Sequence, residues 1–76
     1  MKEIIEYIAV RLVDHPDDVK VTEEEERGRT IVRLEVAEDD YGKVIGKGGR
    51  IAQALRGMLK VSAVRHEEYA SLEIGD

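Results

Sequence analysis

The apolar residues near the start of the chain recur with the period of an α-helix. They stand three and four positions apart and therefore share one helical face, at Ile5, Ile8, Ala9 and Leu12. This spacing predicts a helix over about Lys2–Val13. Pro16 pushes the residue before it toward extended backbone angles, so we expect the helix to end at residues 14–16.

Two segments after the proline alternate apolar and polar residues, as strands do when one face is buried. The first covers about residues 19–22 and fades into four glutamates, and the second covers Thr30–Val36. The four residues Glu26–Arg29 are expected to supply an antiparallel turn, in which Gly28 tolerates a positive φ. We interpret the glutamates as a solvated edge strand that resists aggregation rather than as an acidic binding tail.

The second half of the chain reads as helix, loop, helix and strand. A short helix is expected over about Asp39–Ile45, a longer one over about Gly49–Val64 and a strand over Tyr69–Ile74. The longer helix carries a core stripe made of Ala52, Leu55, Leu59 and Ala63. The order predicts a two-layer α+β fold (α-β-β-α-α-β) in one domain over residues 1–76, with a three-stranded mixed sheet packed against three helices. The last strand should run parallel to the second.

Charge is distributed unevenly along the chain. The net charge is −5, yet the stretch Tyr41–Arg65 holds six basic residues, and all 17 acidic residues lie outside it. Screening over about 8–10 Å allows a basic face to coexist with an acidic remainder. The acidic total therefore does not exclude a nucleic-acid partner.

The sequence lacks the residues that several classes of function require. There is no cysteine, no metal-ligand spacing, and no histidine beside a nucleophile, so we expect no enzyme activity, metal, cofactor or small-molecule substrate. The first residues lack the apolar core of a signal peptide, and no run approaches the roughly 20 apolar residues that span a bilayer. We therefore expect a cytoplasmic protein without a membrane partner.

The glycine-rich break between the two later helices has the chemistry of a phosphate clamp. Gly46, Gly48 and Gly49 permit left-handed backbone angles, and the following helix begins with unpaired N–H groups that suit an anion. Lys47 stands at the loop tip, flanked by Lys43 and Arg50. The spacing fits neither a Walker loop nor a dinucleotide fingerprint. It fits V-I-G-x-x-G between two helices.

This segment resembles the KH domain, whose GxxG loop clamps about four nucleotides of single-stranded nucleic acid. The element order resembles the type II, bacterial form. The motif V-D-x-P-D-x-V at residues 13–19 and the segment G-K-V-I-G-K-G-G-R-I-A-x-A-L-R at residues 42–56 resemble, more closely, the KhpA-like family of small stand-alone bacterial KH-domain RNA-binding proteins. Ala52 departs from the wider KH pattern, in which many members carry isoleucine, and is expected to make the groove shallower.

The resemblance implies a single-stranded RNA-binding protein of low sequence specificity. Its expected RNA-binding residues are Lys43, Val44, Ile45, Gly46, Lys47, Gly48, Gly49, Arg50 and Ile51. One groove wall would be formed by Val44, Ile45 and the helix after the loop, and the other by the central strand. The resemblance also implies a post-transcriptional regulator or RNA chaperone that forms a homodimer, or a heterodimer with a KhpB/Jag-like KH protein. The alternative is a scaffold subunit that uses the fold mainly to dimerise.

Two residues keep two interpretations each. Tyr41 either packs at a helix start, the favoured reading, or stacks on a base. Gly57 lies inside the long helix at a cost near 1 kcal/mol relative to alanine. It indicates either close helix packing or a flat contact for another chain.

Overall fold

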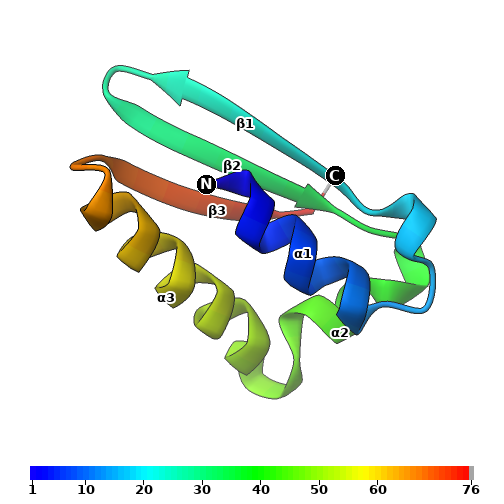
Figure 1. Ribbon diagram of the computed structural model, residues 1–76. Coiled ribbons are helices and arrows are strands. Elements are labelled where there is room, and N and C mark those ends of the chain that lie inside the picture. Colours follow the sequence, from blue (N-terminus) through cyan, green and yellow to red (C-terminus); the bar gives the residue numbers. More distant parts are fainter. Residues whose placement is uncertain (76) are drawn as a thin grey trace.

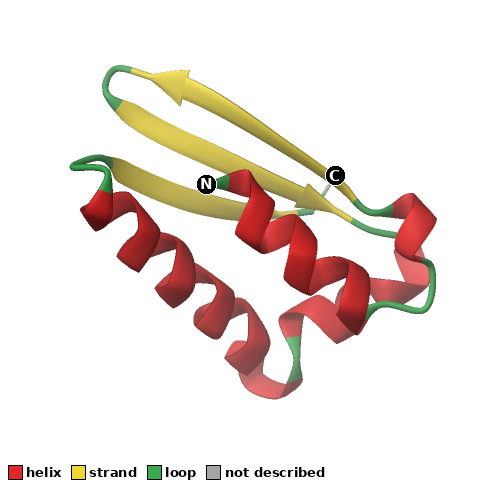
Figure 2. Ribbon diagram, in the orientation of Figure 1, coloured by secondary structure: helices red, strands yellow, loops and turns green. Residues whose placement is uncertain are grey.

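The computed structural model describes residues 1–75 and contains one layer of helices on one face of a sheet (Figures 1 and 2). The helices are α1 (Lys2–Leu12), α2 (Tyr41–Ile45) and α3 (Arg50–Arg65), and the strands are β1 (Lys20–Glu26), β2 (Arg29–Glu35) and β3 (Tyr69–Ile74). Short 3₁₀ turns cover Pro16–Asp18, Glu38–Asp40 and Lys47–Gly49. The predicted element order and two-layer α+β architecture are confirmed.

The sheet has the strand order β1-β2-β3. β1 and β2 pair antiparallel, and β2 and β3 pair parallel, as predicted. The loop, α2 and α3 form the crossover between the parallel strands. β3 is therefore an edge strand, and α3 runs beside it (Figure 1).

The connection between β1 and β2 is tighter than the sequence indicated. β1 extends through all four glutamates, and Glu26 pairs with Arg29, so only Arg27 and Gly28 form the turn. Both residues have positive φ, 52° and 77°, the conformation that two-residue hairpins with a right-handed twist require. The strand was expected to fade at the glutamates and the connection to span four residues, and both were wrong, because cross-strand pairing overrides the poor β-propensity of glutamate. The positive φ predicted for Gly28 is confirmed, and β1 is the edge strand that the glutamates indicated.

Two of these glutamates have partners. Glu23 points to the helical side, where its Oε1 accepts a hydrogen bond of 2.9 Å from the backbone N–H of Lys2 at the start of α1. On the opposite face, Arg33 of β2 donates to Glu73 of β3 at 2.8 Å and lies 4.0 Å from Glu24. Glutamates of β1 therefore make side-chain contacts on both faces of the sheet.

The core lies between the helical layer and β2. Its largest fully buried apolar side chains come from all three helices and the central strand: Ile5, Val32, Leu34, Val44, Leu55 and Leu59. The predicted stripe of α3 is confirmed, since Ala52, Leu55, Leu59 and Ala63 are all buried. On α1, Ile5 and Ala9 are buried, while Ile8 and Leu12 are half-buried against the same core.

A buried carboxylate joins the α1–β1 connection to the start of α2. Asp40 is only 1% exposed, and its two oxygens accept hydrogen bonds from the backbone N–H groups of Asp14 (3.3 Å) and His15 (3.0 Å). The segment after α1 therefore has its backbone donors satisfied by a residue 25 or 26 positions further along the chain. This contact holds α2, and the glycine loop that follows it, against the end of α1.

We expect Asp40→Ala to lower the free energy of unfolding by about 2 kcal/mol, because it leaves two partly buried N–H groups without acceptors. Asp39→Ala is the matched control: Asp39 is exposed, and its replacement should change stability by less than about 0.5 kcal/mol. Urea unfolding of both variants measures the difference. Equal stabilities would contradict a bridging role for Asp40.

Candidate nucleic-acid interface

The glycine loop makes a sharp turn between α2 and α3. The N–H of Gly46 donates to the carbonyl of Gly42 at 2.9 Å and closes α2, and the N–H of Gly49 donates to the carbonyl of Gly46 at 3.1 Å. Gly46, Gly48 and Gly49 have φ values of 75°, 65° and 76°. The predicted use of left-handed backbone angles at these glycines is confirmed.

Glycine stands at these loop positions for different physical reasons. A Cβ on Gly46 would lie 2.7 Å from Cγ1 of Ile51, so the first turn of α3 packs directly on the backbone there. A Cβ on Gly48 or Gly49 would meet nothing within 4 Å. Gly46 therefore shapes the loop, whereas the backbone at Gly48 and Gly49 is open to an incoming group.

The start of α3 is suited to an anion. Gly49 is the N-cap and supplies no side-chain hydrogen bond to the first turn, so the N–H groups there keep no partner from a cap. Lys47 and Arg50 are exposed on either side, and neither has an ion pair among residues 1–75. The N–H groups of Gly49 and Arg50 bond to the carbonyls of Gly46 and Lys47 within the loop. The loop tip therefore offers an anion the open backbone at Gly48 and two unpaired positive side chains.

The other predicted site residues occupy different places. Nζ of Lys43 lies 3.1 Å from Oδ2 of Asp14, and this hydrogen bond raises the pKa of Lys43 above its usual value. Val44 is fully buried in the core, so it supports the loop from beneath. Ile45 is exposed and Ile51 half-buried, which leaves aliphatic surface beside the loop.

A shallow hollow runs between α3 and the edge strand β3. Its volume is about 420 Å³, and its walls come from these two elements and their connection: Arg56, Leu59, Lys60, Ala63, Val64, Glu68, Tyr69, Ala70, Ser71 and Leu72. In this hollow the strand beside α3 is β3 and not the central strand that was expected to form the second wall. β2 lies between its two neighbours, and its helix-facing side chains Val32 and Leu34 are completely covered.

The hollow adds two basic residues to the candidate interface that the sequence reasoning did not select. Successive residues of a helix are 100° apart, so Arg56 and Lys60 lie on the flank of α3 between the core stripe and the outer face. Both side chains line the hollow beside β3. They belong to the acid-free stretch of the sequence, and that charge pattern was the signal for them.

The structure bears on the residues that kept open interpretations. Tyr41 is half-buried and packs against the core, which favours its packing role. A Cβ on Gly57 would meet nothing within 4 Å, so close helix packing inside this chain does not explain the glycine. Ala52 is 4% exposed and belongs to the core face of α3, so it does not set the depth of the surface groove.

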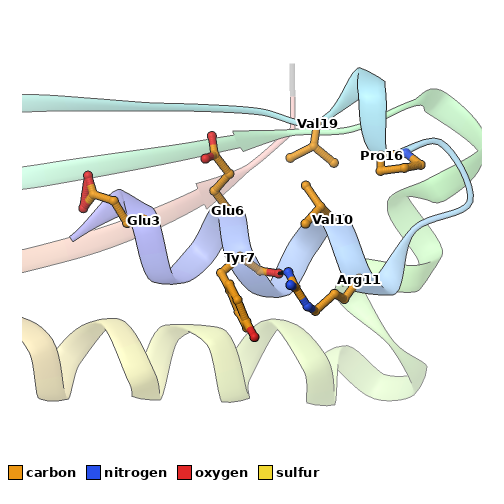
Figure 3. A pocket seen from close by; sticks show the side chains of 7 residues that line it. All are labelled: Glu3, Glu6, Tyr7, Val10, Arg11, Pro16 and Val19. Atoms are coloured by element: carbon orange, nitrogen blue, oxygen red, sulfur yellow. Dashed lines mark hydrogen bonds between the residues drawn. The ribbon is translucent and has the colours of Figure 1, made fainter.

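A second hollow lies between α1 and the connection to β1 (Figure 3). The guanidinium of Arg11 lies 3.6 Å from the centre of the Tyr7 ring and donates a 2.8 Å hydrogen bond to the carbonyl of Tyr7. Glu3 and Glu6 also line this hollow. Its basic and aromatic groups are already paired with each other, and its free charges are acidic, so it does not suit a nucleic acid.

Two other classes of site are absent from residues 1–75. No group of three or more His, Cys, Asp or Glu side chains is arranged to hold a metal ion in this part of the chain. None of its helices is long and apolar enough to cross a membrane.

Comparison with known proteins places this geometry in a family. A family model described as "KhpA/KhpB, KH domain" matches residues 2–74. The chain is similar to RNA-binding protein KhpA of Treponema pallidum (51% identity over 75 residues, 99% of this chain and 94% of the relative). It is also similar to the KhpA proteins of Halalkalibacterium halodurans (46% over 76 residues, 100% of both chains) and Bacillus subtilis (41% over 76 residues, 100% of this chain and 94% of the relative).

One solved structure supports the fold independently. An Aquifex aeolicus Era variant bound to GDP.AlF4- matches with a TM-score of 0.56 and 19% identity, over 96% of this chain and 28% of the Era chain. At that identity the likeness concerns the fold alone.

We expect Gly46→Ala to destabilise the protein by about 2–3 kcal/mol. Its backbone angles (φ 75°, ψ 171°) are essentially restricted to glycine, and the added Cβ collides with Ile51. Gly42→Ala is the control four residues earlier, where φ is not positive and the space is open, so stability should stay equal or rise by up to about 1 kcal/mol. Thermal unfolding distinguishes them, and an unaffected Gly46→Ala would contradict the close-approach argument.

Proposed function

The chain belongs to the KhpA/KhpB KH-domain family and has the type II KH fold, and from this premise we propose that it binds single-stranded RNA through the Gly46–Gly49 loop. The observation that carries the proposal is the exposed backbone at Gly48 and Gly49, next to the unpaired Lys47 and the uncapped start of α3. Relatives that match the whole chain are named RNA-binding proteins. Members of this family are not enzymes.

In the proposed complex, the loop amides and Lys47 bind the phosphates of the RNA backbone. Arg50, Arg56 and Lys60 continue the positive charge along α3, and the hollow beside β3 accepts the bases. Exposed aliphatic surface at Ile45 and Ile51 contacts sugar or base faces beside the loop. Because phosphate contacts carry no sequence information, we expect low sequence specificity.

The shape of the hollow favours unpaired RNA. Its walls are one helix and one edge strand, and the bases of a strand can enter such a groove only when they are not paired with a second strand. Binding of this kind suits a post-transcriptional regulator or RNA chaperone in the cytoplasm, with single-stranded RNA as its ligand.

We further propose that the outer face of α3 joins two KH chains. Val61 and Val64 are 62% and 68% exposed, and together with Gly57 they line a shallow apolar hollow flanked by Lys60 and Arg65. Gly57 then provides the flat contact for another chain. The partner is a second copy or a KhpB/Jag-like KH protein, since a similar helix in either would offer the same apolar face. This surface is what the scaffold alternative would use.

The loop hypothesis is tested by the double variant Lys47→Asp/Gly48→Asp. Two negative charges at the phosphate position each add repulsion on the order of 1–3 kcal/mol, so affinity for a single-stranded RNA octamer should fall at least about a hundredfold. Fluorescence anisotropy with labelled octauridine measures the loss.

The matched control is Lys47→Asn/Gly48→Asn, which has the same shape without the charge. Gly48 has φ 65°, so both double variants have the same backbone cost of about 1 kcal/mol, reduced by the tolerance of Asn and Asp for this region. The neutral pair loses only the Lys47 contact and should bind more tightly than the acidic pair. Parental affinity in the folded acidic variant would refute the loop as the RNA site and leave the scaffold role.

The dimer hypothesis predicts that Val61→Glu abolishes self-association at micromolar concentrations. The charge would be placed in the middle of the apolar face, and the melting temperature of the monomer should not change because the side chain is largely exposed. Sedimentation velocity of the parent and the variant checks this. A parent chain that is monomeric and captures no KH partner in pull-downs would contradict the hypothesis.

A further inference from the structure

The three tyrosines of the chain lie in different environments. Tyr7 lies under the guanidinium of Arg11, and Tyr41 packs on the core. Tyr69 is 79% exposed, the largest exposure among the big hydrophobic side chains of residues 1–75, and within that range it makes no side-chain hydrogen bond or cation–π contact. An exposed aromatic ring without a partner has a free face on which a base can stack.

Tyr69 stands at one end of the hollow proposed to hold RNA. It begins β3 directly after the turn that follows α3, and it lines the same hollow as Arg56 and Lys60. In Figure 1 this end of β3 lies beside the C-terminal end of α3, whereas the glycine loop lies at the other end of that helix. The loop and Tyr69 therefore lie toward opposite ends of α3, and the hollow extends from Arg56 to the Tyr69 end.

The segment before Tyr69 is fixed to the sheet. Oγ1 of Thr30 donates a hydrogen bond of 3.1 Å to Oε2 of Glu68, and the N–H of Glu68 donates to the carbonyl of Ala63 at 2.9 Å. Thr30 is itself buried, so this contact anchors the turn to the central strand. The Glu68 carboxylate thus accepts its hydrogen bond from a neutral hydroxyl on the central strand.

Positive charge adjoins the ring on the neighbouring strand. Arg29 of β2 is the register partner of Tyr69, and strand alternation places both on the open face of the sheet, with Arg33 and Glu73. Arg27 precedes Arg29 in the hairpin turn. Both arginines are exposed, and neither has an ion pair among residues 1–75. Arg33, four residues after Arg29 on β2, differs because it forms an ion pair with Glu73. Arg27 and Arg29 also line a hollow at the hairpin end, together with Glu26, the cross-strand partner of Arg29, so the hollow has two cations and one carboxylate.

We propose that Tyr69 and Arg29 form a second RNA contact, in which the ring stacks on a base and the guanidinium binds the adjoining phosphate. The inference rests on the proposed function and extends its footprint. α3 has 16 residues and is about 24 Å long, whereas four stacked nucleotides at the loop cover about 14 Å. A strand that continues along α3 and passes over the edge of β3 therefore reaches Tyr69 and Arg29 with nucleotides beyond the first four.

The test compares tetrauridine with octauridine on the full chain. Tyr69→Ala should weaken octamer binding about five- to a hundredfold, the range of one lost base–aromatic stack, and leave tetramer binding unchanged. Tyr69→Phe keeps the ring and should bind both oligonucleotides as the parent does. Because a stacked ring releases no counterion, Tyr69→Ala should keep the parental slope of log affinity against log salt, whereas Arg29→Ala should make it shallower by about 0.7.

A spectroscopic readout locates the contact. An octamer with 2-aminopurine at one end should lose fluorescence on binding when that end lies on Tyr69, and recover it with Tyr69→Ala but not with Tyr69→Phe. No quenching at either end would overturn the proposal.

The outcomes separate this inference from the function on which it rests. If the parent binds neither oligonucleotide, RNA binding itself fails. If the parent binds both and Tyr69→Ala binds the octamer like the parent, the loop site stands and the second contact is refuted. Equal weakening of both lengths would place Tyr69 within the four-nucleotide footprint and overturn the extension. Circular dichroism of each variant confirms that the fold is intact.

Discussion

The packing of α3 on the sheet is the constraint from which the other surfaces of the molecule follow. Leu55 and Leu59 are each 1% exposed, and they fix which side of the helix faces the core. With 100° between successive residues, that choice leaves a flank beside β3 and an outer face. Arg56 and Lys60 fall on the flank, and Val61 falls about 140° from Arg56, on the outer face. One buried stripe therefore directs Arg56 toward the hollow beside β3 and Val61 toward the outer face, with Lys60 and Val64 at the border between the two hollows.

The acidic residues and the basic residues have different structural roles, which reconciles an acidic protein with an RNA partner. Glu23 binds the start of α1, Asp40 joins α2 to the α1–β1 connection, and Glu68 anchors the turn before β3. These carboxylates are engaged with internal donors. By contrast, the cations along the groove have no acidic partner among residues 1–75. Glu68 also lines the groove, so the local field there is set by Arg56, Lys60 and this one carboxylate, because more distant charges are screened within about 8–10 Å.

The sequence predicted the features that depend on near neighbours. The α3 stripe, the glycine loop and the pairing directions follow from local periodicity and from the short connections between elements. The features that were missed depend on contacts between distant residues. Asp40 reads as an ordinary acid at a helix start, yet its partners lie 25 and 26 positions away. The groove wall was assigned to β2 because the sequence does not state which of two parallel strands lies at the edge of the sheet.

The glycine loop by itself is a small site. The residues that support it hold its backbone in place, so that it can act together with other contacts. Gly46 is held against Ile51, and Asp40 fixes α2, so the open backbone at Gly48 and Gly49 is presented on a rigid support. Rigid presentation lowers the entropy lost on binding. Weak contacts spaced along one strand add in a similar way, because each makes the next intramolecular. A second chain docked on the outer face of α3 would border the first groove at Lys60 and Val64 and would supply a second groove. Affinity for a long single strand would then come from the number and spacing of such contacts rather than from the strength of any one of them.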